Sequence, residues 1–481
     1  MSTAPLIALK HGLYIGGEWV ETDQHDEIRL PYDGSVVGLV AHASEAHVYR
    51  AIEAAQQGAR AMALLANHER ADLLLRIADQ VRNDEDELAH TICSETGKPI
   101  KEARVEAKRS VDTLIAAAHA ARDLHGEVVP MDFASGGERR MAITVREPLG
   151  VIGAITPFNF PLNLTLHKLA PALAAGNAVV HKPAERTPLS ALRLAHLVTA
   201  AGAPPGAYNV VTGDGPALAA VILRHPDVAM VTFTGSMKVG AELRSRAGLK
   251  RVTLELGNNS AVIIEPDADL ATAISRSAQG AFGLSGQSCI SLQRAFVHEA
   301  VAGEYTDGLV AAARKLRIGH PYESSTDISC LIDESAAIRV EGWIQEAVAA
   351  GARLLCGGKR HRATIEPAVL TNVPANARIS CEEVFGPVVA VYSYPSLDGA
   401  VALANGTPYG LQAGIFTRDL AHAFSAARKL TFGGVLINDI PTFRMDHMPY
   451  GGVKSSGIGR EGPRYAIEEM TELKLICWKS E

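Results

Sequence analysis

Short apolar runs alternate with Ala/Leu-rich helical stretches between residues 149 and 256, and this alternation constrains the fold more than any other feature. The runs are VIGAI (151–155), NAVVHK (177–182), YNVV (208–211), VAMVTF (228–233) and RVTLEL (251–256), and PLSALRLAHLVTAAG (188–202) is one of the intervening helical stretches. Strands that alternate with helices at this spacing form βαβ units and a parallel sheet. The sequence therefore predicts an α/β fold.

The segments that follow these runs are the candidate binding segments, because ligands on parallel sheets bind beyond the carboxyl ends of the strands. They are TPFN (156–159), KPAE (182–185), TG (212–213), TGS (234–236) and GNN (257–259). We expect a dinucleotide site here. The segment around Gly235 and Gly240 does not match G-x-G-x-x-G, so this expectation depends on position rather than on that motif.

The rest of the chain indicates further units. A length of 481 residues exceeds one ordinary core, and a second α/β block is predicted over residues 256–460. Residues 67–92 have the pattern of one long surface helix that stops at TGKP (96–99). Residues 123–147 predict a hairpin around 135–137, and TELKLICWK (471–479) predicts a strand. Because both would expose sheet edges unless another chain covers them, we expect a homo-oligomer.

Composition excludes several classes of protein. A net charge of −7 gives no basic excess for nucleic acid. The six cysteines are scattered without metal-ligand spacing, which predicts reduced thiols, a cytoplasmic protein and no metal. Residues 1–12 lack a basic segment before their short apolar run, so no secretory signal is expected. The most apolar region, 149–180, is interrupted by Pro157, Pro161, His167, Lys168 and Pro171, so no membrane span is expected.

Three side chains are candidates for catalysis. Cys289 follows a run of small residues in GLSGQSC (283–289), which would let a ligand approach a nucleophilic thiol. Glu255 ends a predicted buried strand, where a carboxylate lowers the stability of the fold unless it is exposed or has a function. Asn159 lies between aromatic residues and prolines and could donate to an oxyanion. Each also has a structural explanation: a buried thiol, a salt-bridged carboxylate and a turn asparagine.

Taken together, the motifs resemble the aldehyde dehydrogenase superfamily over roughly residues 12–480. They are TPFNFPLN, KPAERTP, FTGS, LELGNNS, GQSC, EEVFGPV, NDI and MPYGGVKSSGIGREG. The resemblance implies a Rossmann-like NAD-binding domain (1–123 and 148–255), an α/β catalytic domain (256–463) and a small β oligomerisation domain (124–147 and 464–481). It also implies that a small-molecule aldehyde is oxidised to a carboxylate.

The resemblance assigns roles to individual residues. Cys289 would be the nucleophile, Glu255 the base that activates water, and Asn159, with the Cys289 amide, the oxyanion hole. The implied cofactor-binding residues are Thr156, Phe158, Lys182, Glu185, Gly213, Gly235, Ser236, Gly240, Glu383 and Phe385. Of these, Lys182 and Glu185 would hold the adenosine ribose, Ser236 the pyrophosphate, and Glu383 the nicotinamide ribose.

The choice between NAD and NADP and the identity of the aldehyde depend on single residues rather than on shared motifs. A carboxylate at Glu185 would repel a 2′-phosphate, so NAD is expected over NADP, although the Lys182 cation leaves NADP possible. The resemblance implies a substrate tunnel, and the expected substrate-binding residues along it are Arg109, His167, Arg444 and Tyr450. Arg444 on the wall of this tunnel would favour an aldehyde with an anionic tail. The alternative is that Arg444 only pairs with Asp439 or Asp446.

Small anionic or hydroxylated aldehydes are substrates of the subgroup that this chain resembles, which includes lactaldehyde, phosphonoacetaldehyde, sulfoacetaldehyde and succinate-semialdehyde dehydrogenases. Ser288 and Phe160 stand where phosphonate-oxidising members have basic residues. Asn258 stands where most members have glycine. Two other functions stay open: a CoA-acylating dehydrogenase, which typically lacks a glutamate at position 255, and a non-catalytic protein on the same fold.

Overall fold

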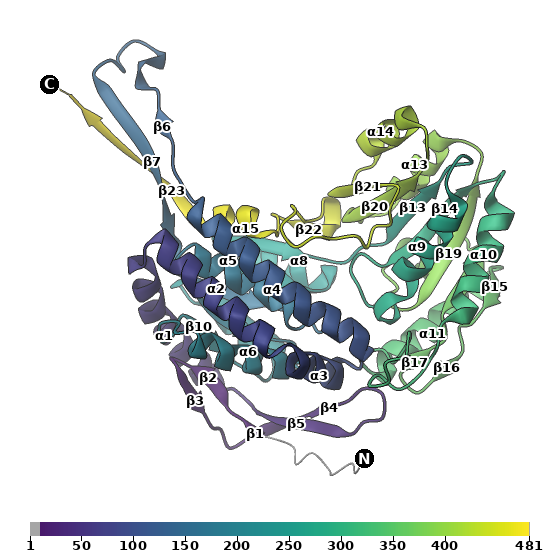
Figure 1. The fold of residues 1–481 in the computed structure, drawn as a ribbon, viewed down its shortest axis with the longest axis horizontal. Coiled ribbons are helices and arrows are strands. Elements are labelled where there is room, and N and C mark those ends of the chain that lie inside the picture. Colours follow the sequence, from purple (N-terminus) through teal and green to yellow (C-terminus); the bar gives the residue numbers. More distant parts are fainter. Residues whose placement is uncertain (1–9, 481) are drawn as a thin grey trace.

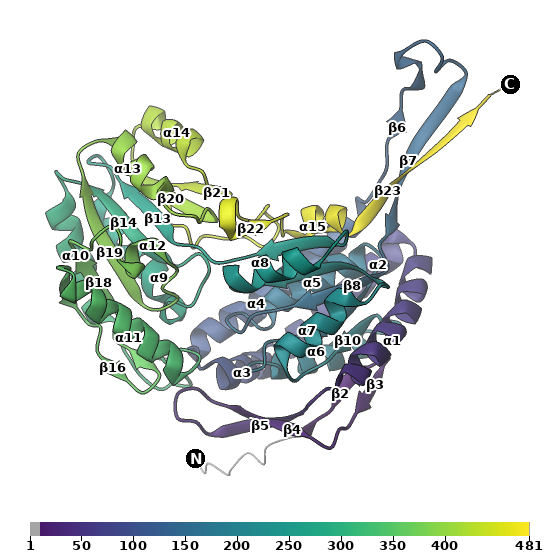
Figure 2. The same cartoon turned by 180° about the vertical axis from the view of Figure 1, so that it is seen from behind.

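The computed structural model describes residues 10–480, so most of the segment judged to lack a secretory signal lies outside the described range. Two α/β units lie side by side, and a long β arm projects from the first of them (Figure 1, and from behind in Figure 2). The expected α/β fold with a parallel sheet in each unit is confirmed. No helix among the described residues is both long and apolar enough to cross a bilayer.

The first sheet contains the strands expected from the apolar runs. Its order is β22 (Gly457–Ile458), β12 (Arg251–Glu255), β11 (Val228–Thr234), β8 (Val151–Ile155), β9 (Ala178–Lys182), β10 (Tyr208–Val210), β2 (Leu13–Ile15) and β3 (Glu18–Val20). The strands from β12 to β10 pair in parallel, and near their carboxyl ends Ile155 is paired with Lys182 and Phe233, and Thr234 with Glu255. The segments that follow these strands therefore meet at one edge.

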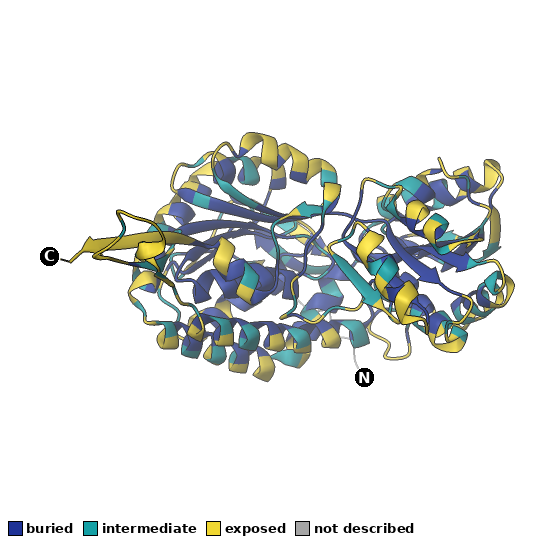
Figure 3. Ribbon diagram, turned by 90° about the horizontal axis from the view of Figure 1, so that it is seen from above, coloured by how far each residue is buried: buried dark blue, intermediate teal, exposed yellow. Residues whose placement is uncertain are grey.

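Helices cover both faces of this sheet. One face is packed by α1 (Glu45–Leu64), α7 (Gly215–Arg224) and α8 (Met237–Arg246). The other is packed by α2 (Asn67–Asn83), α3 (Glu85–Thr96), α4 (Ile100–Arg122), α5 (Asn163–Ala174), α6 (Leu189–Ala200) and α15 (Pro463–Glu469). The strands between these layers are buried, as Figure 3 shows. Helix α4 begins beside the second unit, where Lys101 and Glu102 contact it, and runs from there toward the base of the arm (Figure 1).

The second sheet has the order β15 (Arg353–Cys356), β18 (Ala368–Thr371), β19 (Val388–Tyr394), β14 (Leu292–His298), β13 (Ser260–Ile264), β20 (Gln412–Phe416) and β21 (Gly434–Ile437). Helices α9 (Leu270–Phe282) and α10 (Ala302–Lys315) pack on one face. Helices α11 (Glu334–Ala349), α13 (Leu397–Asn405) and α14 (Leu420–Lys429) pack on the other, and the short α12 (Arg378–Cys381) precedes β19. Cys289 lies between α9 and β14.

Smaller sheets complete the chain. Strands β1 (Lys10–His11), β5 (Val36–Ala41) and β4 (His25–Arg29) form one, and β16 (Arg360–His361) pairs with β17 (Thr364–Ile365). The arm consists of β6 (Val128–Val129), β7 (Arg140–Pro148) and β23 (Thr471–Lys479), which confirms the expected hairpin and terminal strand. The domain limits drawn from the sequence stay a prediction, and two elements cross them: β22 joins the first sheet and α15 packs on α4.

The single helix expected over residues 67–92 is wrong, because the chain breaks between α2 and α3 at Asp84. This residue has φ −104° and ψ 10°, and its carboxylate pairs with Arg193 of α6. Aspartate favours helix ends because its short side chain competes for nearby hydrogen bonds. The expected end of the helical region at residues 96–99 is confirmed: α3 ends at Thr96, and Gly97 follows with φ +70°.

Gly97→Ala tests how tightly this helix end is packed. A Cβ at Gly97 would lie 2.3 Å from the Cys330 sulfur, in addition to the cost of the positive φ. Gly202, which follows α6 with φ +84°, is the matched control, because a Cβ there would meet no heavy atom of the described residues within 4 Å. We expect Gly202→Ala to lower the free energy of unfolding by about 1 kcal/mol, and Gly97→Ala by about 1–3 kcal/mol more. Chemical denaturation checks this, and equal losses would contradict the packing argument.

Candidate active site

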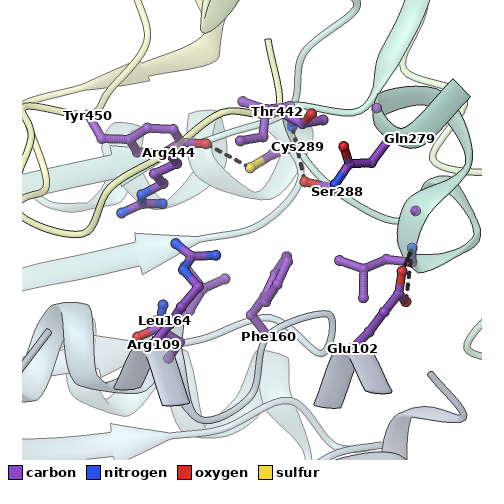
Figure 4. A pocket seen from close by; sticks show the side chains of 15 residues that line it. Glu102, Arg109, Phe160, Leu164, Gln279, Ser288, Cys289, Thr442, Arg444 and Tyr450 are labelled. Atoms are coloured by element: carbon purple, nitrogen blue, oxygen red, sulfur yellow. Dashed lines mark hydrogen bonds between the residues drawn. The ribbon is translucent and has the colours of Figure 1, made fainter. Parts of the chain in front are cut away.

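A cavity of about 200 Å³ lies between the two units, and Cys289 is on its wall. Figure 4 shows that Glu102, Arg109, Phe160 and Leu164 approach from one side and that Cys289, Arg444 and Tyr450 approach from the other. The first group belongs to α4, α5 and the segment that precedes α5. The second group belongs to the loops around β14 and after β21. The cavity therefore joins residues that are far apart in the sequence.

Cys289 is partly exposed to the cavity, and its sulfur lies 2.9 Å from the Tyr450 hydroxyl oxygen. Burial raises the pKa of the thiol to about 12, against the opposing effects of the Tyr450 hydrogen bond and the Arg444 cation. The thiol of the protein without ligands is therefore protonated at neutral pH. A nucleophilic thiolate needs a further change at the site, such as a base or a bound positive charge.

Asn159 reaches the Cys289 loop from the first unit. Its Nδ2 donates to the backbone carbonyl of Gln287, two residues before Cys289, at 2.9 Å. The amide is buried, and its Oδ1 has no partner among the described residues. A carboxamide nitrogen carries two N–H donors, so one remains for an oxygen bound near the Cys289 sulfur. The geometry is compatible with the expected oxyanion role.

Glu255 is buried at the end of β12, and neither of its carboxylate oxygens has a hydrogen-bond partner among the described residues. Burial, reinforced by the neighbouring Glu461, raises the pKa of Glu255 well above its ordinary value. Glu461 behaves in the opposite way. Burial acts to raise the pKa of Glu461, but the cations of Lys168 and Arg444 hold it at about 2. One carboxyl of this pair is therefore ionised, and the other is poised to take or release a proton.

Arg444 pairs with neither Asp439 nor Asp446, the two partners considered from the sequence. Its guanidinium donates to Glu461 at 3.0 Å, lies 3.2 Å from His167 Nε2 and stacks 3.6 Å from the centre of the Tyr450 ring. Asp439 instead pairs with Arg276. The predicted pairing of Arg444 with an aspartate is therefore wrong, because its partner is Glu461. The position of Arg444 on the cavity wall agrees with the expected substrate-binding role.

Asp446 organises the neighbouring part of the wall. It accepts two hydrogen bonds from Arg109, at 2.8 and 3.1 Å, one from Asn163 at 3.1 Å, and its Oδ1 lies 2.9 Å from His167 Nε2. Arg109 lines the cavity, as expected. His167 is buried and is not among the residues that line the cavity. Its Nε2 lies between Arg444 and Asp446, so it contacts two residues of the wall, and its expected substrate-binding role stays a prediction.

A second groove, of about 380 Å³, follows the carboxyl edge of the first sheet. The expected cofactor-binding residues that line it are Thr156, Phe158, Lys182, Glu185, Gly235 and Ser236. Lys182 pairs with Glu185 at 2.8 Å, and a Cβ on Gly215 would lie 1.7 Å from that carboxylate, so a larger residue there would displace the Glu185 side chain. Ser236 caps α8, whose first N–H groups suit a phosphate. These features fit a dinucleotide.

Phe385 and Glu383 of the second unit are not among the residues that line this groove, but Phe385 contacts Phe158 on its wall. Phe385 meets Phe158 edge-on, with ring centres 5.8 Å apart. Glu383 accepts a hydrogen bond from the backbone N–H of Asn258 at 3.0 Å, and burial raises the pKa of Glu383 to about 7. The Asn258 side chain donates to Ser260 at 2.6 Å, which ties the strand end in place where most relatives have glycine.

Gly213 and Gly240 are not among the residues that line this groove, and their expected cofactor-binding roles stay predictions. Gly240 lies on α8 against Leu256, where a Cβ would approach a side-chain carbon to 2.4 Å. Gly213 adopts φ +134° beside His42 and Ala43. Both glycines allow close packing of the chain, and a position after a strand does not distinguish that role from contact with a ligand.

Several charged residues of the site were not identified from the sequence. Lys168 donates to Glu461 at 2.9 Å and to Thr234 at 2.7 Å, and all three are buried. Glu102 lines the cavity. The available signal for Lys168 was its place inside the apolar stretch 149–180, where a cation requires a partner. Glu102 gave no such signal, because it lies in a charged helical segment.

Comparison with known proteins agrees with this geometry: residues 19–476 match the aldehyde dehydrogenase family. The chain belongs to that family. A 3-sulfolactaldehyde dehydrogenase of Priestia aryabhattai is 46% identical over 467 residues, which cover 97% of this chain and 98% of the relative. The family and its fold are therefore established for nearly the whole length.

Solved structures of the family have the same fold. Aldehyde dehydrogenase 21 of Physcomitrella patens, in complex with the reaction product succinate, has a TM-score of 0.96 and 40% identity, covering 98% of this chain and 99% of that chain. An NADP-dependent glyceraldehyde-3-phosphate dehydrogenase of Bacillus halodurans has a TM-score of 0.95 and 36% identity, covering 98% and 99%. Other members are NAD-dependent, so the family uses either dinucleotide. The chain is an oxidoreductase that oxidises an aldehyde to an acid.

The raised pKa of Cys289 predicts how the thiol reacts in the protein without cofactor. We expect the rate of alkylation by iodoacetamide to rise continuously between about pH 7 and pH 10, because the thiolate fraction still grows with pH below a pKa near 12. Mass spectrometry of the peptide that carries Cys289 measures this rate, and glutathione in the same reaction serves as the reference thiol. A plateau for Cys289 near pH 8 would contradict the burial argument.

Proposed function

We propose that this enzyme oxidises a small anionic aldehyde to its carboxylate with NAD, through a covalent intermediate on Cys289. The observation that carries the proposal is the presence of Cys289 and Arg444 on the wall of one cavity, with Asn159 hydrogen-bonded to the loop that carries Cys289 and Glu255 buried nearby. The thiol, the amide and the unpaired carboxyl supply a nucleophile, an oxyanion donor and a base. The arginine supplies a charge to hold the far end of the substrate.

The first half of the reaction forms the covalent intermediate. The Cys289 thiolate attacks the aldehyde carbon, and the Asn159 amide and the Cys289 backbone N–H stabilise the negative charge that develops on oxygen. A bound nicotinamide would accept the hydride when this hemithioacetal collapses to a thioester. Phe158 and Phe385 enclose that end of the groove and keep water away from the reacting carbon.

The second half of the reaction releases the acid. Glu255 in its ionised form takes a proton from a water molecule, which attacks the thioester and frees Cys289. Because burial and Glu461 raise the pKa of Glu255, the base is mostly protonated at low pH and becomes ionised as the pH rises. The same glutamate argues against the CoA-acylating alternative, which needs no water-activating base, and against a non-catalytic role.

NAD is the proposed cofactor, with support from the Lys182–Glu185 pair. The Glu185 carboxylate is exposed at the groove and available to a ribose 2′-hydroxyl, whereas a 2′-phosphate would meet its negative charge. Lys182 and Glu185 would hold the adenosine ribose, Ser236 and the first turn of α8 the pyrophosphate, and Glu383 the second ribose. Gly235 leaves space for the backbone to approach the phosphates.

An anionic substrate is supported by the arginines of the cavity. Arg109 and Arg444 both line it, and guanidinium groups bind carboxylates and sulfonates through paired hydrogen bonds. Tyr450 lies between Arg444 and Cys289, so the charged tail and the aldehyde carbon of a short substrate would reach both ends of the cavity. The relatives that act on 3-sulfolactaldehyde or yield succinate are consistent with a short anionic aldehyde.

A homo-oligomer, either a dimer or a tetramer, is proposed on the basis of the arm. Leu473, Leu475, Ile476 and Trp478 of β23 are all exposed in the single chain. An apolar edge strand of this length favours pairing with another copy. The cytoplasmic location and the lack of nucleic-acid and membrane partners stay predictions.

Cys289→Ala and Glu255→Gln separate the two halves of the reaction. Cys289→Ala should abolish NADH formation while NAD binding, measured by calorimetry, is retained. Glu255→Gln should keep a rapid burst of one NADH per site and slow steady turnover by at least about 100-fold, because general-base catalysis contributes about 100- to 10,000-fold. Steady turnover of the unaltered enzyme should rise with pH as Glu255 ionises. Residual turnover in Cys289→Ala would refute the nucleophile, and a normal steady rate in Glu255→Gln would refute the base.

Arg109→Ala and Arg444→Ala test the anionic tail. Both should raise KM for succinate semialdehyde and sulfoacetaldehyde by at least about tenfold, since a charge-assisted hydrogen bond contributes about 1.5–3 kcal/mol. KM for lactaldehyde and butanal should change little. Arg104→Ala, at an exposed arginine on the same helix as Arg109, is the control. Equal losses for anionic and neutral aldehydes would show that the two arginines act only through the fold.

A further inference from the structure

The turn that leads to Cys289 has an unusual backbone. Leu284 and Ser285 adopt φ +55° and +53°, and Gly286 follows with φ +73°. Consecutive left-handed residues are costly unless they are glycine, because the Cβ approaches the neighbouring carbonyl. Such a turn persists only when its surroundings hold it. The position of the Cys289 sulfur, three residues further on, depends on what holds this turn.

Glu102 of the first unit holds this turn in place through hydrogen bonds. Both of its carboxylate oxygens accept the backbone N–H of Leu284, at 3.0 and 3.1 Å (Figure 4). Two contacts within the second unit also hold this turn. The Ser285 hydroxyl donates to the Ser329 carbonyl at 3.3 Å. Gly286 packs closely against the backbone of Gly386, since a Cβ at Gly286 would lie 2.1 Å from the Gly386 oxygen. Glu102 differs from these contacts because it belongs to α4 of the first unit.

The same helix holds the segment that carries Asn159. Glu106, one turn after Glu102, accepts the backbone N–H groups of Leu162 and Asn163 at 3.0 and 3.1 Å. Its other oxygen accepts from Lys98 at 2.6 Å, and Lys98 donates in turn to the Asn159 carbonyl at 2.5 Å. Lys98 and Glu106 are buried, so this arrangement is fixed.

Residues four apart on a helix lie on one face, one turn from each other. The carboxylates of Glu102 and Glu106 therefore hold the two loops of the active site at a set separation. We propose that Glu102 is a positioning residue, through which helix α4 fixes the Cys289 sulfur relative to the Asn159 amide. The proposal rests on the proposed function, since it takes the roles of these two residues from it.

Removal of the Glu102 carboxylate should affect the chemical step more than binding. In Glu102→Ala the Leu284 N–H loses its acceptor and the left-handed turn can relax. A displacement of about 1 Å at a reacting atom can reduce the rate about 100-fold. Glu102→Gln keeps a carbonyl oxygen for the same N–H and should retain most of the rate. The dinucleotide groove is lined by other residues, so NAD binding should not change.

Stopped-flow measurement of the NADH burst tests this with full-length wild type, Glu102→Ala, Glu102→Gln and the control Asp112→Ala, an exposed carboxylate on the same helix. We expect the burst rate of Glu102→Ala to fall at least about tenfold, with Glu102→Gln within about threefold of wild type and Asp112→Ala unchanged. The Kd for NAD should be equal in all four. Thermal unfolding is measured in parallel. A wild-type burst rate in Glu102→Ala, or an equal loss in Glu102→Gln with a matching drop in Tm, would overturn the proposal.

Alkylation of Cys289 by iodoacetamide gives a readout that does not require turnover. If wild type forms no NADH with any aldehyde, the proposed function fails, while the positioning role can still be assessed from this rate. Glu102→Ala should alkylate at a rate that differs from wild type by more than about threefold, because thiol reactivity depends on its surroundings. Identical rates in all four proteins would overturn the proposal independently of the reaction.

Discussion

Charged side chains buried between the two sheets must be paired, because an unpaired buried charge destabilises a fold by several kcal/mol. Lys98 is paired with Glu106 at 2.6 Å, and Glu461 with Lys168 and Arg444 at 2.9 and 3.0 Å. Each of these groups links elements that are distant in the sequence. The helices on the first sheet and the loops of the second unit are therefore held in one arrangement, and the cavity lies where they meet.

Glu255 is the exception to this pairing. Its oxygens are buried without partners among the described residues, and the nearby cations are taken by Glu461. The consequence is a carboxyl group that stays neutral until the pH rises, next to one that stays charged. Two carboxyl groups with widely different pKa values are typical of acid–base sites. The unsatisfied group is therefore the residue that we propose as the base of the reaction.

The strands and their parallel order could be predicted because apolar runs and helical stretches alternate, and this pattern follows directly from burial of both sheet faces. Cys289 and Asn159 could be assigned to one site from motifs that the chain shares with the family, and Arg444 could be added from its place six residues before Tyr450. The partner of Arg444 could not, because Glu461 is close only after the chain folds. Glu102 and Glu106 lie in a charged helical segment, where a surface carboxylate and a buried one look alike. The roles of Gly213 and Gly240 could not be decided from the sequence, since close packing of the chain and contact with a ligand both select glycine.

The central claim is that the oxidised substrate becomes covalently attached to Cys289. The most direct test is mass spectrometry of Glu255→Gln protein mixed with NAD and succinate semialdehyde and quenched in acid during the burst. The account predicts an added succinyl mass on the peptide that contains Cys289, in proportion to the NADH formed. NADH formed in equal amount with an unmodified Cys289 peptide would contradict it.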